Sequence, residues 1–491
     1  MILAANEALS TDLCDALLAR GFDIRAAVRV TGYGDHKIAT IKQVREINTK
    51  IGLRDAKNAV EGSKIVLRNA SLTLAEQACA KLHVVGGAAE VLPSHGFRYV
   101  FDPKHPQRGA QPCTRVEIRA GQLELRHAQL GSWAEAEPAQ TRFGPDDDQA
   151  LLDAYDALRQ RWAEDGLREA TSETELLLAL CARNPELERS FDDAASDTPE
   201  LAAAAAVYAD WLLEQGDPRG QLGAAQLATT AASGTEFEAL LEAWAPHVLG
   251  PFHALRESWN LDWCGPLVTH VDLRAPEGID PHALLESSLG LPVMAAVRHL
   301  QIRGECADHP ELGRLLDQAT CAGTVRTLEL GRSRLMMLRG AQLPRLERLR
   351  TDTGYLPRFE LDAPELRSFH CSSNWYSSRY ALDEAFAGLD APQLQHLYLE
   401  LSYGPQWQSY HGPFEPQMRR MFALPCFGRL VTLTLSSVED GPLLQPDFVD
   451  MLRSSPAMAT LVRIDLRGLA LGDEARAQLA RARDELPELW L

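Results

Sequence analysis

The second half of the chain repeats one short pattern of apolar and polar positions. Each copy has the form L-x-x-L-x-L, loosely kept, so that its last two apolar residues alternate with polar ones. Alternation of this kind predicts a half-buried β-strand. The copies are Val268–Leu273, Val297–Ile302, Val325–Leu330, Leu346–Thr351, Leu366–Cys371, Leu394–Leu399, Leu430–Leu435, Leu461–Leu466 and Leu486–Leu491, and their starts lie 29, 28, 21, 20, 28, 36, 31 and 25 residues apart.

Spacings of this size leave room for one strand and one return segment per copy, stacked so that neighbouring copies bury each other's apolar faces. The pattern resembles leucine-rich-repeat proteins, and the resemblance implies a solenoid over residues 233–491 whose concave face binds a protein. The flanking polar residues line that face, and Arg348, Arg350 and Tyr398 are its candidate binding residues. A helix over 235–245, stopped by Pro246, is expected to cap the open end.

Two longer segments between the copies are rich in aromatic residues. Trp375 and Tyr376 lie in one of them, and Tyr403, Trp407 and Tyr410 lie in the other. Aromatic side chains exposed on loops are frequent anchors of protein interfaces, which makes these five candidate partner-binding residues. The alternative is that they fold back and fill the core of an irregular coil.

The first 95 residues alternate between strand and helix spacing. Helices are expected over 11–20, 37–51, 53–60 and 71–85, and strands over 22–31 and 89–92. Ser10 or Thr11 is the expected N-cap of the first helix, and Gly21 its stop. Ile38, Ile41, Val44 and Ile47, three apart, are expected on one apolar face of the second helix.

The pattern I-K-x-V-R-x-I in Ile41–Ile47, followed by G-L-x-x-A-K-x-x-V-E in Gly52–Glu61, resembles the C-terminal domain of the bacterial ribosomal stalk protein, over about residues 22–93. In that family the first helix and the turn after it dock translational GTPases. The resemblance therefore implies a GTPase contact through Ile38, Ile41, Lys42, Arg45 and Lys57. The alternative is that this small α/β unit has been reused without a ribosomal role.

Residues 96–170 predict a hairpin with strands over 115–119 and 122–126, followed by a helix over 149–164. This arrangement is weakly similar to WGR domains, but the defining Trp-Gly-Arg tripeptide is absent, so DNA binding is not carried over. The phrase Val207–Gly220 closely resembles the repeat-companion domain found beside leucine-rich repeats. Gly216 is expected to close one helix and Asp217 to cap the next, while the acidic stretch Glu186–Pro199 is expected to be a loop.

The expected fold is therefore α/β and multidomain. It comprises a small N-terminal α/β domain (1–95), a hairpin-plus-helix middle domain (96–170), a helical companion domain (171–232) and a C-terminal leucine-rich-repeat solenoid (233–491). The net charge is −19, and residues 1–95, with twelve Lys/Arg and ten Asp/Glu, are the part that is not acidic. An acidic surface of this size makes nucleic acid an unlikely partner.

No apolar run is long enough for a membrane span, no signal peptide is recognised, and nine scattered cysteines fit a reducing cytoplasm. No P-loop, nucleophile elbow, zinc-protease motif or dinucleotide fingerprint is present, so no catalytic residue, cofactor or metal is expected. The sequence predicts a non-enzymatic bacterial scaffold or interaction protein. The alternative function is a translation-linked factor that contacts a GTPase through the N-terminal domain.

Overall fold

The structure is a computed structural model that describes residues 8–48, 52–104, 113–119, 122–128, 136–143, 147–193, 199–228, 231–250, 253, 260–275, 281–309, 311–333, 338, 340–353, 359–374, 382–402, 414–436, 450–451, 454–469, 472–481 and 488–490. The chain forms two compact units. The N-terminal unit comprises Met1–Ala182, Gln215–Pro218 and Ala243–His253, and the C-terminal unit comprises Arg183–Glu214, Arg219–Glu242 and Ala254–Leu491. The division predicted from the sequence, into four domains, stays a prediction.

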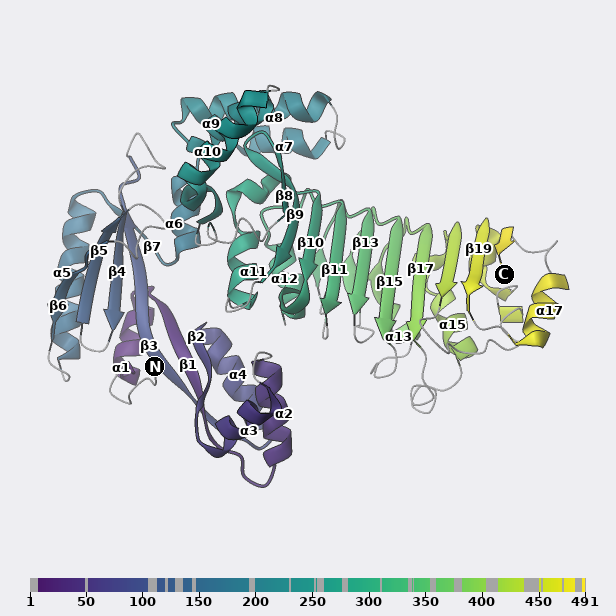
Figure 1. Ribbon diagram of the computed structural model, residues 1–491, viewed down its shortest axis with the longest axis horizontal. Coiled ribbons are helices and arrows are strands. Elements are labelled where there is room, and N and C mark those ends of the chain that lie inside the picture. The colour runs from purple at the N-terminus through teal and green to yellow at the C-terminus, as the bar shows by residue number, and fades with distance from the viewer. Residues whose placement is uncertain are drawn as a thin grey trace. The chain divides into compact units, whose positions relative to one another are not determined.

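The N-terminal unit is built on one antiparallel sheet with helices packed against it (Figure 1). Its elements are α1 (Thr11–Ala19), β1 (Asp23–Gly32), α2 (Lys37–Ile47), α3 (Leu53–Glu61), β2 (Ile65–Ser71), α4 (Leu72–Val84), β3 (Ala88–Phe101), β4 (Cys113–Arg119), β5 (Gln122–Ala128), β6 (Ala139–Arg142), α5 (Asp148–Glu164), β7 (Arg168–Ala170) and α6 (Glu173–Leu180).

The central strand of this unit is β3, which is far longer than the strand predicted over 89–92. The sheet order is β2-β1-β3-β4-β5-β6, with β7 also paired to β3, and every pairing is antiparallel. The start of β3 lies beside β1, and its end lies between β4 and β7. One strand thus passes through the boundary predicted at residue 95.

Two hydrophobic cores lie along this sheet. The first packs α2, α3 and α4 against β1 through residues such as Val28, Val44 and Leu82, and the second packs α1 and α5 against β4 through residues such as Leu17, Val116 and Tyr155. The predicted start of α1 is confirmed, because the Ser10 hydroxyl accepts the backbone N–H of Leu13. Gly21 ends that helix with a φ of 75°, a conformation that favours glycine.

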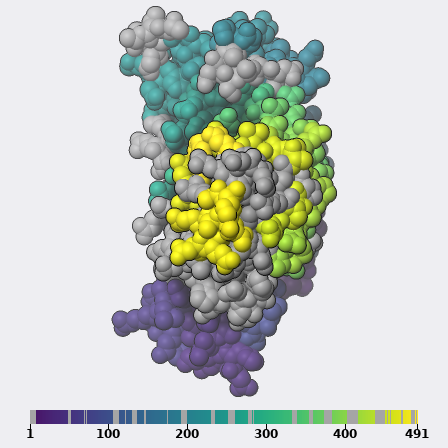
Figure 2. Space-filling model, turned by 90° about the vertical axis from the view of Figure 1, so that its right-hand side faces the viewer, coloured from purple at the N-terminus to yellow at the C-terminus, as the bar shows by residue number. Residues whose placement is uncertain are grey.

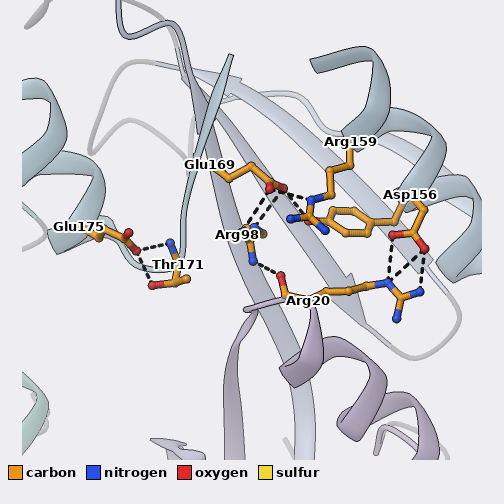
Figure 3. Close-up of polar contacts among 8 residues, drawn as sticks. Arg20, Arg98, Asp156, Arg159, Glu169, Thr171 and Glu175 are labelled. Carbon is orange, nitrogen blue, oxygen red and sulfur yellow. Dashed lines mark hydrogen bonds and ion pairs between the residues drawn. The ribbon is translucent and has the colours of Figure 1, made fainter. Parts of the chain in front are cut away.

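Polar side chains fasten α1, β3, α5 and β7 to one another (Figure 3). The Arg20 guanidinium donates to the Asp156 carboxylate, with Nη2 2.6 Å from Oδ2. Glu169 accepts hydrogen bonds from Arg98 Nη2 at 3.2 Å, Arg159 Nε at 2.9 Å and the Tyr155 hydroxyl at 2.7 Å. The short β7 strand, which the sequence did not indicate, places Glu169 between these groups.

The C-terminal unit begins with helices and continues as a long sheet. Its helices are α7 (Pro185–Asp193), α8 (Pro199–Glu214), α9 (Pro218–Leu227), α10 (Ala231–Leu249), α11 (Pro281–Leu289), α12 (Leu312–Asp317), α13 (Leu382–Phe386), α15 (Phe414–Phe422), α17 (Asp473–Arg481) and the 3-10 helices η3 (Pro292–Ala296), η4 (Gly304–Asp308), η6 (Pro425–Phe427) and η7 (Pro456–Ala459). The first residue of α9, Pro218, and the last part of α10, from Ala243 onward, are assigned to the N-terminal unit.

The strands of this unit form two sheets. The larger one contains β8 (Asn260–Cys264), β9 (Leu267–Arg274), β10 (His299–Arg303), β11 (Thr327–Ser333), β13 (Arg348–Thr353), β15 (Ser368–Asn374), β17 (His396–Ser402), β18 (Thr432–Ser436), β19 (Arg463–Gly468) and β20 (Glu488–Trp490). The smaller one contains β12 (Ala341–Gln342), β14 (Glu360–Asp362) and β16 (Gly388–Asp390).

Every copy of the apolar pattern contributes one strand to the larger sheet. The strands from β9 to β20 follow one another in chain order and pair in parallel, so equivalent positions of successive copies lie side by side (Figure 1). Val271, Leu300 and Leu328 begin one such row and are fully buried. The strands predicted from the pattern are thus confirmed. An additional strand, β8, pairs antiparallel with β9 and forms the first edge.

One predicted loop and one predicted helix end are wrong. The acidic stretch from Glu186 forms most of α7, because Asn184 Oδ1 accepts the backbone N–H groups of Glu186 and Leu187, and Phe191 is buried. Pro246 does not stop α10, which runs to Leu249. Burial of Val248 and Leu249 offsets the hydrogen bond that proline removes.

The far end of the larger sheet is formed by β19 and β20 (Figure 1), which belong to the C-terminal residues that are yellow in Figure 2. On β20 the Trp490 ring contacts two guanidinium groups from β19, those of Arg463 and Arg467, each 4.4 Å from the ring centre. Among the described residues, no helix is both long and apolar enough to cross a membrane.

Candidate partner-docking surface

The helices α2 and α3 lie side by side and bury one face each against the sheet (Figure 1). On α2 the buried residues are Thr40, Ile41 and Val44, and on α3 they are Ala56, Ala59 and Val60. Small alanines on α3 let the helix approach the core closely. The remaining residues of both helices form the solvent-facing side of this part of the unit.

That solvent-facing side combines apolar and cationic side chains. Ile38 is 74% exposed and Leu53 is 62% exposed, although both side chains are large and apolar. Lys42, Arg45 and Lys57 are exposed on the same two helices. We refer to these five residues as the α2–α3 surface. Water-exposed apolar groups rimmed by charge are typical of interaction sites.

The cations of this surface differ in how far they are neutralised. Lys37 pairs with Glu61, which also lies 4.0 Å from Lys57 Nζ. Hydrogen bonding between Lys37 and Glu61 raises the pKa of the lysine and lowers the pKa of the carboxyl. Lys42 and Arg45 have no acidic partner in the part of the chain that the structure describes, so their charges are available to another molecule.

Four of the residues predicted to contact a GTPase lie on the surface, and one lies in the core. Ile38, Lys42, Arg45 and Lys57 are exposed, whereas Ile41 is only 9% exposed and packs in the core. Ile41 therefore holds α2 in place more than it offers a contact. Leu53, which the sequence analysis did not single out, is exposed instead. Nothing in its spacing distinguishes it from the core positions of α3.

A second candidate surface is the polar side of the larger sheet. Arg350 of β13 lies in register between Glu329 and His370, and His370 lies in register with Tyr398 of β17. The His370 and Tyr398 rings stack with centres 4.0 Å apart, and the Tyr398 hydroxyl lies 2.9 Å from Ser436 Oγ. Burial and the Arg350 charge lower the pKa of His370, which keeps this imidazole neutral at neutral pH.

Arg348 and Arg350 are exposed and Tyr398 is half-buried on this side of the sheet. Arg348 lies beside Thr327 and Ser368 in the neighbouring strands, so no carboxylate flanks it in its row. The predicted aromatic anchors Trp375, Tyr376, Tyr403, Trp407 and Tyr410 lie outside the described residues.

Residues 26–92 match the family described as ribosomal protein L7/L12 C-terminal domain. The resemblance predicted from the sequence is thereby confirmed for this segment, which contains α2, α3 and the whole α2–α3 surface. The match covers a small part of the 491 residues.

The relatives that match over this segment are bacterial large ribosomal subunit proteins bL12. The protein of Maricaulis maris is 49% identical over 65 residues, which are 13% of this chain and 52% of that protein. The protein of Streptomyces virginiae is 45% identical over 65 residues, which are 13% of this chain and 50% of that protein. The chain thus spans about half the length of the curated relatives it matches.

A solved structure from Bacteroides fragilis aligns with 80% of this chain and 95% of that chain at 13% sequence identity. Its TM-score is 0.19, which is too low to indicate a common fold.

Proposed function

We propose that this chain is a non-enzymatic interaction protein whose N-terminal unit docks a translational GTPase through the α2–α3 surface. The observation that carries the proposal is Ile38, an isoleucine three-quarters exposed beside cations without acidic partners, within a segment that matches a ribosomal stalk domain. The stalk family docks such GTPases with the corresponding helices. A translational GTPase works in the cytoplasm, so the proposal places the chain there.

The chemistry of the α2–α3 surface fits a partner with an acidic, partly apolar patch. Ile38 and Leu53 would lose water from their side chains on docking, which contributes about 25 cal/mol for each Å² of apolar area buried. Lys42 and Arg45 would meet carboxylates and accelerate the encounter by electrostatic attraction. The rest of the chain carries a strong net negative charge, so long-range attraction to an acidic partner favours approach through this region.

Ribosome co-sedimentation of the full chain at low salt tests this proposal. The wild-type chain should sediment with ribosomes that carry a bound translational GTPase, and Arg45→Glu should abolish this because it places a carboxylate against an acidic partner. Lys81→Glu is the matched control, since it makes the same charge change at an exposed position of α4. Equal sedimentation of the Arg45→Glu and Lys81→Glu variants would refute the proposal.

A second interaction is favoured by the in-register polar side of the larger sheet. We infer that residues 233–491 form a leucine-rich-repeat solenoid, joined to a repeat-companion domain, and that its concave face binds a protein. Arg348 has no carboxylate beside it in its row, and Arg350 is exposed, so we expect the partner to present an acidic patch to them. Trp375, Tyr376, Tyr403, Trp407 and Tyr410 stay candidate anchors for that partner on the grounds of the sequence alone.

The second interaction is tested by reversing charge on the strand face of the full chain. The double variant Arg348→Glu, Arg350→Glu should lose proteins that the wild-type chain retains from a lysate, as identified by mass spectrometry. Arg314→Glu is the control, because Arg314 is exposed on α12 in a return segment. Retention of the same proteins by both variants would count against the strand face.

A further inference from the structure

Three buried side chains meet in the N-terminal unit from segments far apart in the sequence. Cys181 follows α6, Asp217 follows α8, and His247 lies in α10. They are 5%, 1% and 2% exposed, respectively. One thiol, one carboxylate and one imidazole are thus enclosed together, although the sequence analysis expected no metal site and interpreted Asp217 as a helix cap.

The three ligand atoms of this trio converge on a common point. Cys181 Sγ lies 3.8 Å from His247 Nε2, and His247 Nε2 lies 3.7 Å from Asp217 Oδ1. All three atoms lie within 4.8 Å of one another. In a tetrahedral zinc site, bond lengths of 2.0–2.3 Å place neighbouring ligand atoms about 3.3–3.6 Å apart. The two separations that involve His247 Nε2 therefore lie within a few tenths of an ångström of that geometry, and the third, within 4.8 Å, would have to shorten as the ion binds.

The local fold directs the carboxylate into the trio. Gly216 ends α8 with a φ of 68°, which turns the chain so that Asp217 precedes Pro218 at the start of α9. Asp217 Oδ2 accepts the backbone N–H of Ala182 at 2.9 Å, and the other carboxylate oxygen, Oδ1, is the one that faces His247. Carboxylates that bind a metal are usually held in place by a hydrogen bond of this kind to their other oxygen.

The same geometry argues against a nucleophilic cysteine. In a Cys-His-Asp triad, the thiol contacts one ring nitrogen and the carboxylate holds the other. Here both Cys181 Sγ and Asp217 Oδ1 approach the same nitrogen, Nε2. Burial of all three side chains also denies a substrate access to the thiol. Convergence of three ligands on one point is the arrangement that a cation requires.

We propose that Cys181, Asp217 and His247 form a zinc-binding site. Sulfur, nitrogen and carboxylate oxygen are the ligand types that zinc binds in proteins, and these three atoms would occupy three of its four tetrahedral positions. A divalent cation would also neutralise the thiolate and carboxylate within a buried space. Zinc bound here would cross-link three separate segments of the N-terminal unit, a structural role independent of the docking function proposed above.

The metal content of the full chain tests this site. After incubation with zinc chloride and dialysis, the wild-type chain should retain one zinc ion per chain, as measured by elemental mass spectrometry. Its Tm should also rise when zinc is added. Cys181→Ala should lose both effects. Cys14→Ala is the matched control, because Cys14 lies in the same unit and is also 5% exposed; it should retain both.

Cobalt substitution of the wild-type chain decides the question even if Cys181→Ala does not fold. Cobalt(II) added to the zinc-free chain should produce a thiolate-to-cobalt charge-transfer band, and zinc should displace it. The same band should persist in Cys14→Ala. Absence of the band from the wild-type chain, or zinc retention no greater than that of Cys181→Ala, would overturn the site.

Discussion

Ile38 is the residue on which the docking account depends most. It lies at the start of the α2 apolar positions, three residues before Ile41 and six before Val44. Because 3.6 residues make one helical turn, positions three apart fall about 60° short of alignment, so Ile38 and Val44 point about 120° apart. This drift places Val44 in the core with no exposure and leaves Ile38 74% exposed.

We expect Ile38→Ala to weaken binding to a translational GTPase while changing the free energy of unfolding by no more than about 0.5 kcal/mol, as is usual for exposed positions. Val44→Ala removes two buried methyl groups and should destabilise the chain by about 2 kcal/mol. Urea unfolding and titration calorimetry measure the two quantities. A large loss of stability in Ile38→Ala would show that Ile38 serves folding.

At the scale of elements, β7 and α5 depend on Glu169 and its three donors. Arg98 contacts Glu169 with a side chain only 10% exposed, whereas the Arg159 side chain is 47% exposed. Arg98 also donates to the backbone carbonyl of Arg20. Both arginines share one acceptor, but only Arg98 is shielded from water.

Arg98→Met should therefore destabilise the chain by about 3 kcal/mol, because it leaves the shielded Glu169 carboxylate with only an exposed guanidinium and one hydroxyl as donors. Arg159→Met should cost at most about 1 kcal/mol, because water replaces an exposed ion pair. Thermal unfolding of both variants provides the comparison. Equal losses in the two variants would contradict the assignment of Arg98 as the buried connection.

The helix α7 is also held by a shielded acid. Glu188 accepts hydrogen bonds from Arg183 Nη2 at 2.6 Å and from the Tyr208 hydroxyl at 2.9 Å, and its side chain is 11% exposed. Burial raises the pKa of Glu188, but the hydrogen bonds and charge of Arg183 outweigh burial, so the pKa lies below its ordinary value.

A folded-state pKa below the unfolded value, about 4.3 for glutamate, stabilises the fold above that value. The contribution disappears as the pH falls through the lower folded-state pKa. Glu188→Gln should therefore lower Tm at neutral pH, and the difference from wild type should shrink as the pH falls below about 5. Glu186→Gln, at an exposed position of the same helix, should follow wild type at every pH. A constant difference between Glu188→Gln and wild type would contradict this reasoning.

The sequence predicted some of these elements and not others for identifiable reasons. Apolar alternation located the strands from β9 to β20, because each strand buries one face. The same criterion missed α7, because Phe191 is the one fully buried apolar residue among the residues of this acidic helix whose burial the structure describes. It also missed β7, a strand of three residues that pairing with β3 alone defines.

At the scale of the whole molecule, the chain comprises one compact unit that contains the stalk-like helices and a second that is built on a long parallel sheet. Periodicity indicated the sheet of the C-terminal unit, and a local motif indicated the stalk-like helices. Neither could indicate that Gln215–Pro218 and Ala243–His253 belong to the N-terminal unit. That grouping, and the meeting of Cys181, Asp217 and His247 within it, arise from contacts between distant segments that no local pattern encodes.

On the proposed function, the α2–α3 surface occupies the docking site of the ribosomal stalk protein on a translational GTPase. Competition measures this directly: the full chain is bound to an immobilised GTPase, and the isolated C-terminal domain of a bL12 protein is added in excess. We predict that the stalk domain displaces the full chain, and that Arg45→Glu fails to bind at the outset. Undiminished binding of the full chain in the presence of saturating stalk domain would contradict the account.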